Sequence, residues 1–201
     1  MSKLPLVMLM GNRGAGKGSI AEHLRDSLGY VPRGFADPLY ESLSTLNPWI
    51  RVDHGMFSRY NSLVAEHGVD YVKRNYPEVR TYLQLLGTEC GRHVFGTQCW
   101  LKIAEKRSRN DRYTVFFDVR FPNEVAWGRT QLSLFIHVTS DREEPQGAHV
   151  SEYSIDAAKE ADYTIENNGT LAELHTKVDK ILDTWQAEHY SSPLWVPKHE
   201  V

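Results

Sequence analysis

The sequence has few cysteines, no long apolar run and no excess of charge of one sign. Two cysteines among 201 residues, Cys90 and Cys99, are too few for a disulfide framework, and their spacing fits no zinc site. No segment approaches the roughly 20 apolar residues that cross a bilayer. The net charge of −3 excludes a global basic field, so an anionic ligand requires local cations. We expect a cytoplasmic protein that neither enters a membrane nor binds nucleic acid directly.

The composition that remains is that of a globular protein, with 41% hydrophobic and 24% charged residues. The apolar run Leu4–Met10 is followed by a glycine-rich turn, Gly11–Gly18, and not by a signal-peptide cleavage site. It therefore predicts a strand buried on both faces of a parallel sheet. Four-residue apolar spacing after the turn predicts a helix that ends at Gly29.

Further strands and helices alternate along the chain, which predicts a parallel α/β sandwich. Asp37 is expected to cap a helix that runs to Leu46, with helices and no strand from there to about Lys106, punctuated by Pro77 and by glycines 68, 87, 91 and 96. The remaining predicted elements are strands at Tyr113–Phe117, Leu134–Val138 and Tyr163–Ile165, a short helix at Asn123–Arg129, and a helix opened by the capping box Thr170–Glu173 with Leu171, Leu174, Val178, Ile181, Leu182 and Trp185 on one face.

The segment Gly11-Asn-Arg-Gly-Ala-Gly16-Lys17 matches the phosphate-loop pattern G-x-x-x-x-G-K between a predicted strand and a predicted helix. Glycines let backbone N–H groups converge on phosphate oxygens, and the helix N-terminus adds positive potential. The lysine reaches the β- and γ-phosphates. The residues of this loop expected to contact ATP are Arg13, Gly14, Ala15, Gly16, Lys17, Gly18 and Ser19.

The loop departs from its commoner form after Lys17. Gly18 stands where many such loops have serine or threonine, and the hydroxyl comes one residue later, at Ser19. This G-K-G-[ST] variant is similar to the adenylate kinase group of nucleoside monophosphate kinases, and the N-K-x-D sequence of small GTPases is absent. Ser19 is accordingly expected to support Mg²⁺, directly or through water.

Further segments carry the polar side chains of a possible acceptor site. They are Phe35-Ala-Asp-Pro-Leu39, Arg80–Arg92 followed by Trp100, and Asp118-Val-Arg-Phe-Pro-Asn-Glu124 at a predicted strand end. Two more segments, His149-Val-Ser-Glu152 and Asn167-Asn-Gly-Thr-Leu171, follow further along the chain. Ligands of open parallel sheets collect at the carboxyl ends of the strands. With the phosphate loop, these segments resemble the deoxynucleoside monophosphate kinases of tailed bacteriophages, in the same order from about Leu4 to Leu182.

The resemblance implies a three-layer α/β P-loop kinase fold with a parallel sheet, in one domain over residues 1–190. A helical acceptor-binding insertion is expected over about 38–110 and a short lid over about 140–160, with an irregular tail at 191–201. The implied reaction transfers the γ-phosphoryl group of ATP to a deoxynucleoside monophosphate. It gives ADP and a deoxynucleoside diphosphate for phage DNA synthesis, in the host cytoplasm if the protein is phage-encoded.

The resemblance also implies residue roles. Lys17, Asp118 and Arg120 would be catalytic, with Ser19 and Asp118 supporting Mg²⁺ and Arg120 balancing charge that develops in transfer. Arg142, Asn167 and Gly169 would contact ATP. The residues assigned to the acceptor are Asp37, Leu39, Tyr40, Arg59, Arg80, Gln84, Gly87, Thr88, Arg92, Trp100, Asp118, Arg120, Glu124 and His149.

Structural roles remain open for several of these residues. Asp118 has the alternative of a helix cap or an ion pair with Arg120, and Glu124 and Arg92 that of solvated ion-pair partners. Trp100 either stacks on the base or is a core residue. Gly87 is also explained by a helix break, and the Asn167–Gly169 segment by turn chemistry before a helix.

Two positions depart from the pattern of the family. Lysine is common there after the Asp-Pro-Leu stretch, where this chain has Tyr40, so the acceptor phosphate would rely more on arginines. An Arg-Pro-Gly segment is common after the fourth strand, and its absence leaves Arg142 as the displaced lid arginine. We expect the lid to close over ATP and exclude water.

Two other functions are alternatives to a deoxynucleoside monophosphate kinase. A kinase that acts on a hydroxymethylated base in phage DNA would reuse the phosphate loop, but the acidic balance and the lack of a basic run disfavour it. A non-catalytic nucleotide-binding regulatory module is disfavoured by the presence of Lys17, Asp118 and Arg120. The sequence leaves open which bases are accepted and whether the protein is a monomer or a homodimer.

Overall fold

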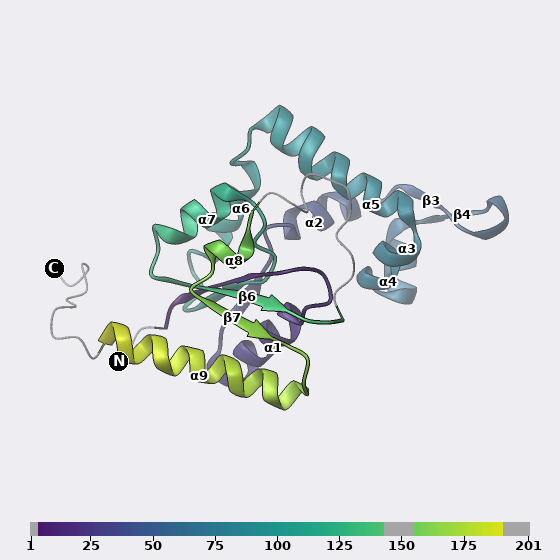
Figure 1. The fold of residues 1–201 in the computed structure, drawn as a ribbon. Coiled ribbons are helices and arrows are strands. Elements are labelled where there is room, and N and C mark those ends of the chain that lie inside the picture. Colours follow the sequence, from purple (N-terminus) through teal and green to yellow (C-terminus); the bar gives the residue numbers. More distant parts are fainter. Residues whose placement is uncertain (1–3, 143–154, 191–201) are drawn as a thin grey trace. The chain divides into compact units, whose positions relative to one another are not determined.

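The computed structural model describes residues 4–142 and 155–190. The chain divides into two compact units, one made of Met1–Gly34 with Asn110–Val201 and the other of Phe35–Arg109. We call them the sheet unit and the helical unit. In Figure 1 the sheet unit is purple and green to yellow, and the helical unit is blue to teal. The helical unit occupies the part of the chain for which the sequence predicts an insertion over 38–110. Both described cysteines are free thiols.

The sheet unit is built around a five-stranded sheet in the order β2-β5-β1-β6-β7. All neighbouring strands run parallel, which confirms the predicted α/β class. Its described elements are β1 (Leu6–Met10), α1 (Lys17–Leu28), β2 (Val31–Arg33), β5 (Thr114–Phe116), α7 (Pro122–Arg129), β6 (Ser133–Thr139), α8 (Ala157–Glu160), β7 (Tyr163–Glu166) and α9 (Leu171–Tyr190).

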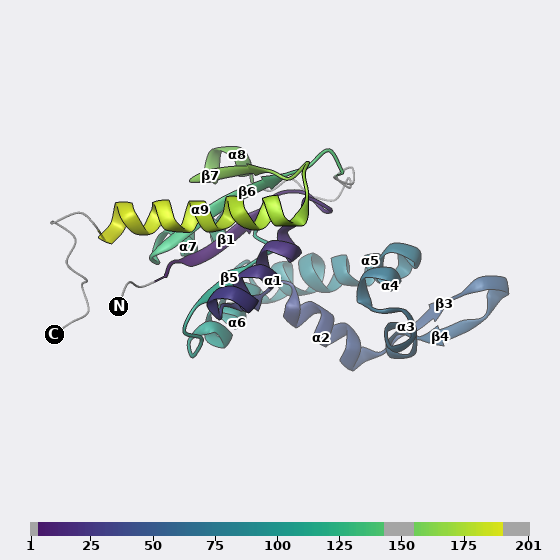
Figure 2. The same ribbon diagram turned by 90° about the horizontal axis from the view of Figure 1, so that it is seen from below.

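Residue alternation along β1 produces three layers. Val7 and Leu9 face the core that α1 and α9 cover, together with Ile20, Leu174 and Val178. On the other face, the Met8 and Phe135 side chains meet α7 so closely that a Cβ at Gly128 would lie 2.9 Å from Met8 Cε and 2.6 Å from Phe135 Cζ. Figure 1 shows α7 and α9 on opposite sides of β6 and β7, and Figure 2 shows α9 running along the sheet. Strands buried on both faces explain the unbroken apolar run in β1.

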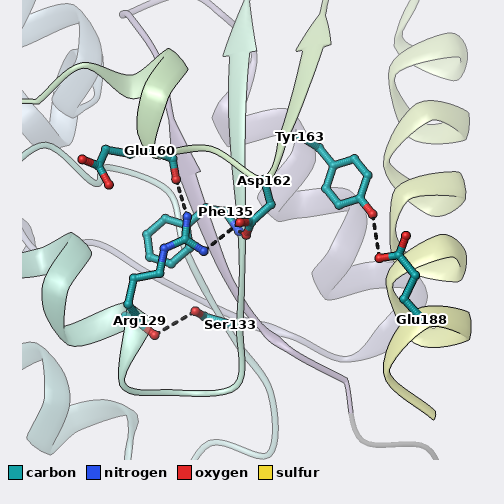
Figure 3. A network of polar contacts seen from close by, with 8 residues as sticks. Arg129, Ser133, Phe135, Glu160, Asp162, Tyr163 and Glu188 are labelled. Atoms are coloured by element: carbon teal, nitrogen blue, oxygen red, sulfur yellow. Dashed lines mark hydrogen bonds and ion pairs between the residues drawn. The ribbon is translucent and has the colours of Figure 1, made fainter. Parts of the chain in front are cut away.

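Polar contacts tie α7 to the β6 and β7 side of the sheet (Figure 3). Arg129 donates to the Asp162 carboxylate at 2.7 Å and to the Glu160 carbonyl, and its guanidinium lies 4.0 Å from the Phe135 ring centroid. The second Asp162 oxygen accepts from the Phe135 backbone N–H at 2.8 Å. Ser133 donates to the Gly128 carbonyl at 2.7 Å. This network positions elements of the fold and lies apart from the phosphate loop.

The helical unit has its own small core. It is formed by Leu43, Ile50, Tyr60, Leu63, Val72 and Val79. Its elements are α2 (Asp37–Leu46), β3 (Trp49–Arg51), the 3₁₀ turn η1 (Asp53–Gly55), β4 (Phe57–Arg59), α3 (Tyr60–His67), α4 (Val69–Asn75), α5 (Pro77–Gln84), the π-helix η2 (Leu85–Val94) and α6 (Cys99–Ser108). Most large apolar side chains that are exposed in the described residues belong to this unit.

Some predicted elements of the chain are wrong. The sequence predicts no strand between Leu46 and Lys106, whereas β3 and β4 form an antiparallel hairpin there. The edge strand β2 was also not expected. Each of these strands has three residues, which is too short for a period-two pattern to be recognised. Strand β1 begins at Leu6 and not at Leu4, and β5 has Thr114–Phe116 only.

The glycines of the helical unit do not all interrupt helices. Gly68 ends α3 at a φ of 82° and Gly96 has a φ of 93°, as the sequence suggests. Gly87 and Gly91, however, lie inside η2, which continues α5 without a break. The helix-break interpretation of Gly87 is therefore wrong. A π-helical segment is rare and is frequently found at functional sites.

Two predicted helix starts have different outcomes. The capping box before α9 is confirmed, because Glu173 accepts from the Thr170 N–H at 2.7 Å, and these bonds hold the pKa of the Glu173 carboxyl below its usual range. On α9, Leu174, Val178, Leu182 and Trp185 are buried, whereas Leu171 is exposed. Helix α2 begins at Asp37, but the N-cap residue is Ala36, so Asp37 is not the cap.

Candidate active site

The glycines of the phosphate loop have positions that other residues cannot take. Gly11, Gly14 and Gly16 have φ values of 129°, 84° and 105°, a region that favours glycine. A Cβ at Gly11 would lie 2.1 Å from the Val138 carbonyl oxygen, and one at Gly16 would lie 2.3 Å from Asn167 Nδ2. The loop therefore needs glycine both for its backbone conformation and for its close approach to neighbouring segments.

Lys17 begins α1 and folds back over this loop. Its Nζ donates to the Gly11 carbonyl at 2.8 Å and to the Asn12 carbonyl at 2.7 Å. The N-cap residue Gly16 makes no side-chain cap to the N-terminus of α1. Backbone N–H groups at such a helix start attract an anion, and the lysine adds a full positive charge beside them. This geometry suits an anion such as a phosphate group.

The other residues after the loop lysine differ in their surroundings. A Cβ at Gly18 would have no neighbour within 4 Å, so space does not require glycine there. Ser19 lies half-buried in the first turn of α1. Its hydroxyl and the Asp118 carboxylate are hard oxygen donors, which suit Mg²⁺ when phosphate oxygens and water complete the coordination. Among the described residues there is no group of three or more His, Cys, Asp or Glu side chains that could hold a metal ion.

Asp118 and Arg120 follow β5 at the same edge of the sheet as the phosphate loop. Strand β5 pairs with β1 through Met8 and Phe116, and the Val119 N–H extends this pairing to the Leu9 carbonyl at 3.3 Å. From β1 the chain crosses to the edge strand β2 and returns to β5, which lies between them, and the next crossover leads from β5 past β1 to β6 and then to β7 on the other side. Such a reversal of strand order opens a crevice at the carboxyl ends of the strands, where ligands bind.

Glu124 caps the start of α7, a structural contact that the sequence analysis did not predict. It is 1% exposed, and its Oε2 accepts from the backbone N–H groups of Arg120 (2.8 Å) and Phe121 (3.1 Å) at the start of α7. The alternative of a solvated ion-pair partner is therefore wrong. A glutamate at the third helical position is a usual capping signal, which the Phe121-Pro122-Asn123-Glu124 segment contains. Its contact with the acceptor stays a prediction.

The segment Asn167–Gly169 lies against the phosphate loop. Asn167 Nδ2 donates to the Ala15 carbonyl at 2.9 Å, so this side chain supports the loop backbone. Arg142 Nη2 donates to the Gly169 carbonyl at 2.9 Å and to that of Asn167 at 3.4 Å. Its guanidinium therefore holds the segment predicted to contact ATP. His149 and most of the predicted lid lie outside the described residues.

The helical unit brings several predicted acceptor residues together around η2. Trp100 Nε1 donates to the Gly87 carbonyl at 2.8 Å, and a Cβ at Gly91 would lie 2.4 Å from the Trp100 ring. A Cβ at Gly87 would lie 3.2 Å from a Leu39 methyl group. Thr88 is buried beside them. Trp100 thus joins α6 to η2, which is a structural role; stacking on a base stays a prediction.

The predicted arginines of this unit have different surroundings. Arg59 is exposed on β4, donates to the Asn47 carbonyl at 2.9 Å, and lies 4.2 Å from the Trp49 ring centroid. Arg92 donates to the Thr97 carbonyl at 3.1 Å. Arg80 lies half-buried on α5, which ends at Gln84. None of these contacts tests a role in acceptor binding.

Tyr40 has a cationic neighbour that the sequence did not indicate. Lys73 Nζ donates to the Tyr40 hydroxyl at 2.7 Å. The two residues lie on different helices, α2 and α4, so no local spacing in the sequence predicts that they meet. Sequence reasoning therefore missed Lys73, and only the packing of the two helices places it there.

A glycine loop of this geometry, at the carboxyl edge of a parallel sheet, is typical of enzymes that bind a nucleoside triphosphate and transfer its phosphoryl group. The chain belongs to the family described as deoxynucleotide monophosphate kinase, whose family model matches residues 56–178, more than half of the chain. It is thus a kinase of deoxynucleoside monophosphates. The matched region begins after the phosphate loop, so the loop is an independent indication of phosphoryl transfer.

Two relatives are similar over different lengths. A putative deoxynucleotide monophosphate kinase of Acanthamoeba polyphaga mimivirus is 24% identical over 189 residues, which cover 89% of this chain and 96% of the relative. The deoxynucleotide monophosphate kinase of Escherichia phage RB69 is 29% identical over 109 residues, which cover 52% of this chain and 44% of the relative.

The solved structures that match this chain have lower sequence identity to it than these two relatives. A shikimate kinase from Acinetobacter baumannii gives a TM-score of 0.48 at 13% identity, covering 91% of this chain and 95% of that one. A dephospho-CoA kinase from Campylobacter jejuni gives 0.43 at 13% identity, covering 90% and 96%. The parallel strand order β2-β5-β1-β6-β7 of this chain defines its fold. Within the described residues, no helix is long and apolar enough to cross a membrane.

Proposed function

We propose that the sheet unit binds ATP and Mg²⁺ and that the helical unit binds the deoxynucleoside monophosphate that receives the γ-phosphoryl group. The observation that carries the first half is the phosphate loop, whose glycines and Lys17 have the geometry described above. The second half is supported by the predicted acceptor residues that gather around η2. The products are ADP and the corresponding deoxynucleoside diphosphate.

The residues divide the work of transfer between them. The backbone of the loop and Lys17 hold the β- and γ-phosphates, and Asn167 fixes the loop through Ala15. Ser19 and Asp118 would hold Mg²⁺, which supplies charge neutralisation at the phosphates when bound. Arg120 offers its guanidinium to the negative charge that develops on the transferred group, and Glu124 fixes the backbone from which Arg120 projects. Catalysis of this kind rests on positioning and electrostatics.

An acceptor screen tests the proposal. The protein is incubated with labelled ATP, Mg²⁺ and either one deoxynucleoside monophosphate or duplex DNA that carries hydroxymethylated bases, and the products are separated. We expect a deoxynucleoside diphosphate with at least one monophosphate acceptor. We expect no labelled phosphate in the DNA. ATP binding without product for any acceptor would instead indicate the regulatory module, and labelled DNA would indicate the base kinase.

Replacement of the loop lysine separates binding from folding. Lys17→Ala removes the charge beside the loop but no buried apolar contact, so we expect at least a ~10²-fold loss of turnover with an unchanged melting temperature. Circular dichroism measures the melting temperature, and the product assay measures turnover. An active Lys17→Ala enzyme contradicts the assignment of the phosphate loop. A cytoplasmic location and the oligomeric state stay predictions.

A further inference from the structure

The β3–β4 hairpin of the helical unit has one face in the core and one face in solvent. On β3, Ile50 is fully buried, whereas Trp49 and Arg51 on either side of it are exposed. The register of the hairpin places Arg59 opposite Trp49 and Phe57 opposite Arg51, and both partners are exposed. Because side chains alternate between the two faces of a strand, these four side chains share the solvent side, which we call the hairpin face. Figures 1 and 2 show the hairpin projecting beyond α3 and α4.

Aromatic rings and guanidinium groups alternate over the hairpin face. Each aromatic residue faces an arginine on the other strand and has an arginine two positions further along its own strand. Positions two apart on a strand are separated by about 7 Å. The Arg59 guanidinium lies 4.2 Å from the Trp49 ring centroid, so a cation–π contact positions it beside the ring.

The side chains of the hairpin face are accessible to a ligand. Trp49 is 55% exposed and Phe57 is 59% exposed. Arg59 donates one hydrogen bond, from Nη1 to the Asn47 carbonyl at 2.9 Å, which leaves its other N–H groups for a ligand. Within the described part of the chain, no hydrogen bond or ion pair engages the Arg51 guanidinium, since the contact of Arg51 is made by its backbone N–H.

The carboxylates near the hairpin do not neutralise these arginines. Glu78 accepts from the Arg51 backbone N–H at 2.9 Å, so its carboxylate lies at the edge of β3. Asp53 lies near Tyr76, where burial and, after it, a neighbouring phenol and two carboxylates that include Asp53 raise the pKa of the Tyr76 hydroxyl. Tyr76 packs against the core that contains Ile50, on the other side of the hairpin. Over residues 4–142 and 155–190, neither carboxylate forms an ion pair with an arginine of the hairpin face.

From this arrangement we infer that the hairpin face binds single-stranded nucleic acid. Exposed aromatic rings are stacking surfaces for unpaired bases, and guanidinium groups beside them bind the phosphates that link those bases. Two local cations can hold such a strand although the net charge of the chain is −3. The expectation that the protein does not bind nucleic acid directly was based on that net charge. Such binding is independent of the proposed function.

A second copy of this chain is the main alternative occupant of the hairpin face. Tryptophan and arginine are also frequent in protein interfaces. A stable interface takes about 20 to 30 residues from each partner, whereas the hairpin face has four. The alternation of rings and cations matches the alternation of bases and phosphates along a nucleotide chain. The face therefore fits a nucleic acid strand better than a protein.

Fluorescence anisotropy with labelled oligonucleotides tests the inference. The probes are oligothymidylate, oligouridylate and duplex DNA with 5′-hydroxyl ends, and ADP and a deoxynucleoside monophosphate are present to fill the proposed substrate sites. We expect binding of at least one single strand, and weaker binding of the duplex, whose bases are stacked on one another. The logarithm of the affinity should fall with the logarithm of the salt concentration with a slope of about −1.4, or about −0.7 for each phosphate contact. No binding of either single strand at low salt overturns the inference.

Substitutions separate stacking from attraction between charges. Phe57→Ala should weaken binding of the single strand about fivefold or more, because one stacked base loses its ring. Arg51→Met should make the salt slope shallower by about 0.7. Phe95→Ala and Arg112→Met, which change exposed residues of the same kinds elsewhere, are the matched controls and should leave binding unchanged. Arg59 is not replaced, because the resemblance to the family also assigns it to the acceptor.

Two patterns of result would contradict the role of the hairpin face. Unchanged affinity in both Phe57→Ala and Arg51→Met places the nucleic acid elsewhere on the protein. A loss in Arg51→Met with no loss in Phe57→Ala shows an electrostatic contact without stacking, which also overturns the inference. Because both side chains are exposed, we expect the circular dichroism melt and the product assay to be unchanged in either variant.

Sedimentation velocity distinguishes the nucleic acid from a second copy of the chain. The unmodified protein and Phe57→Ala are compared without oligonucleotide. We expect the same sedimentation coefficient for both, since the hairpin face is then in solvent. A dimer of the unmodified protein that Phe57→Ala dissociates would assign the face to a second copy and overturn the inference.

Discussion

The sheet unit and the helical unit build their predicted binding residues in different ways. In the sheet unit, the phosphate loop depends on backbone conformation over a few consecutive residues, and its neighbours are backbone groups such as the Val138 carbonyl. In the helical unit, the residues around η2 meet through side chains from separate helices, such as Trp100 with Gly91 and Lys73 with Tyr40. Substitutions should therefore alter the phosphate loop by changing its backbone conformation, and the residues around η2 by changing how their side chains pack.

The two units also differ in their cores. The larger core of the sheet unit includes fully buried residues on β1, β5 and β6 and on both covering helices. The helical unit has a smaller core and exposes large side chains such as Trp49, Phe57 and Phe95. Segments that bury less apolar surface open at lower free energy. We therefore expect faster amide exchange in the helical unit than in the sheet unit.

The largest effect should come from Gly11→Ala. The new Cβ would lie 2.1 Å from the Val138 carbonyl oxygen at a φ of 129°, so the backbone of the loop must move. A displacement of about 1 Å can cost ~10²-fold in rate. We expect at least that loss in turnover, with ATP binding weakened. Gly18→Ala is the control, because its Cβ meets no atom within 4 Å, and it should retain the melting temperature. Similar behaviour of both variants would contradict a backbone-determined site.

An intermediate effect is expected from Gly91→Ala in the helical unit. Its Cβ would lie 2.4 Å from the Trp100 ring, which the Gly87 carbonyl also holds. Such overpacking costs about 1–3 kcal/mol of unfolding free energy. Denaturant unfolding measures this cost, and acceptor KM should rise while ATP KM does not. In Gly87→Ala the nearest atom is a Leu39 methyl group at 3.2 Å, which can turn away, so the effect should be smaller. A larger effect of Gly87→Ala would refute this packing argument.

The smallest effect is expected from the exposed ion pair between α2 and α6. Arg107 donates to both carboxylate oxygens of Glu41, at 2.7 and 2.6 Å, and this contact lowers the pKa of Glu41. A lowered pKa stabilises the fold above the unfolded value of 4.5, and that contribution disappears as pH falls through the folded value. Glu41→Gln should cost less than about 1 kcal/mol at pH 7. As the pH falls below the lowered pKa of Glu41, the difference between the two proteins should vanish, as acid unfolding curves would show.

Much of the fold was predictable from local patterns. The apolar run before the loop, the helix that ends at Gly29 and the capping box before α9 all appear as expected. The missed elements are three-residue strands, for which no periodic pattern exists. Gly87 and Gly91 were misread because glycine usually weakens a helix, whereas here the close approach of Leu39 and Trp100 accounts for them.

The candidate site was predictable to a different extent in each unit. The phosphate loop follows from the sequence because its function resides in consecutive backbone groups. Glu124 was predicted as a site residue, and its capping bonds to the Arg120 and Phe121 N–H groups became visible only in the structure. Arg59, Arg80 and Arg92 were named from the resemblance to the family, and their contacts in the structure leave those roles as predictions.

Because the net charge of the chain is −3, an anionic ligand depends on individual cations at particular sites. By itself, the sequence determined a parallel α/β fold and predicted a phosphate-binding loop with Lys17, because backbone preferences act over a few residues. Only the tertiary structure placed Lys73 at the Tyr40 hydroxyl and Asn167 at the Ala15 carbonyl. Such contacts join residues far apart in the chain, and the packing of helices and strands, not local preference, determines which side chains meet.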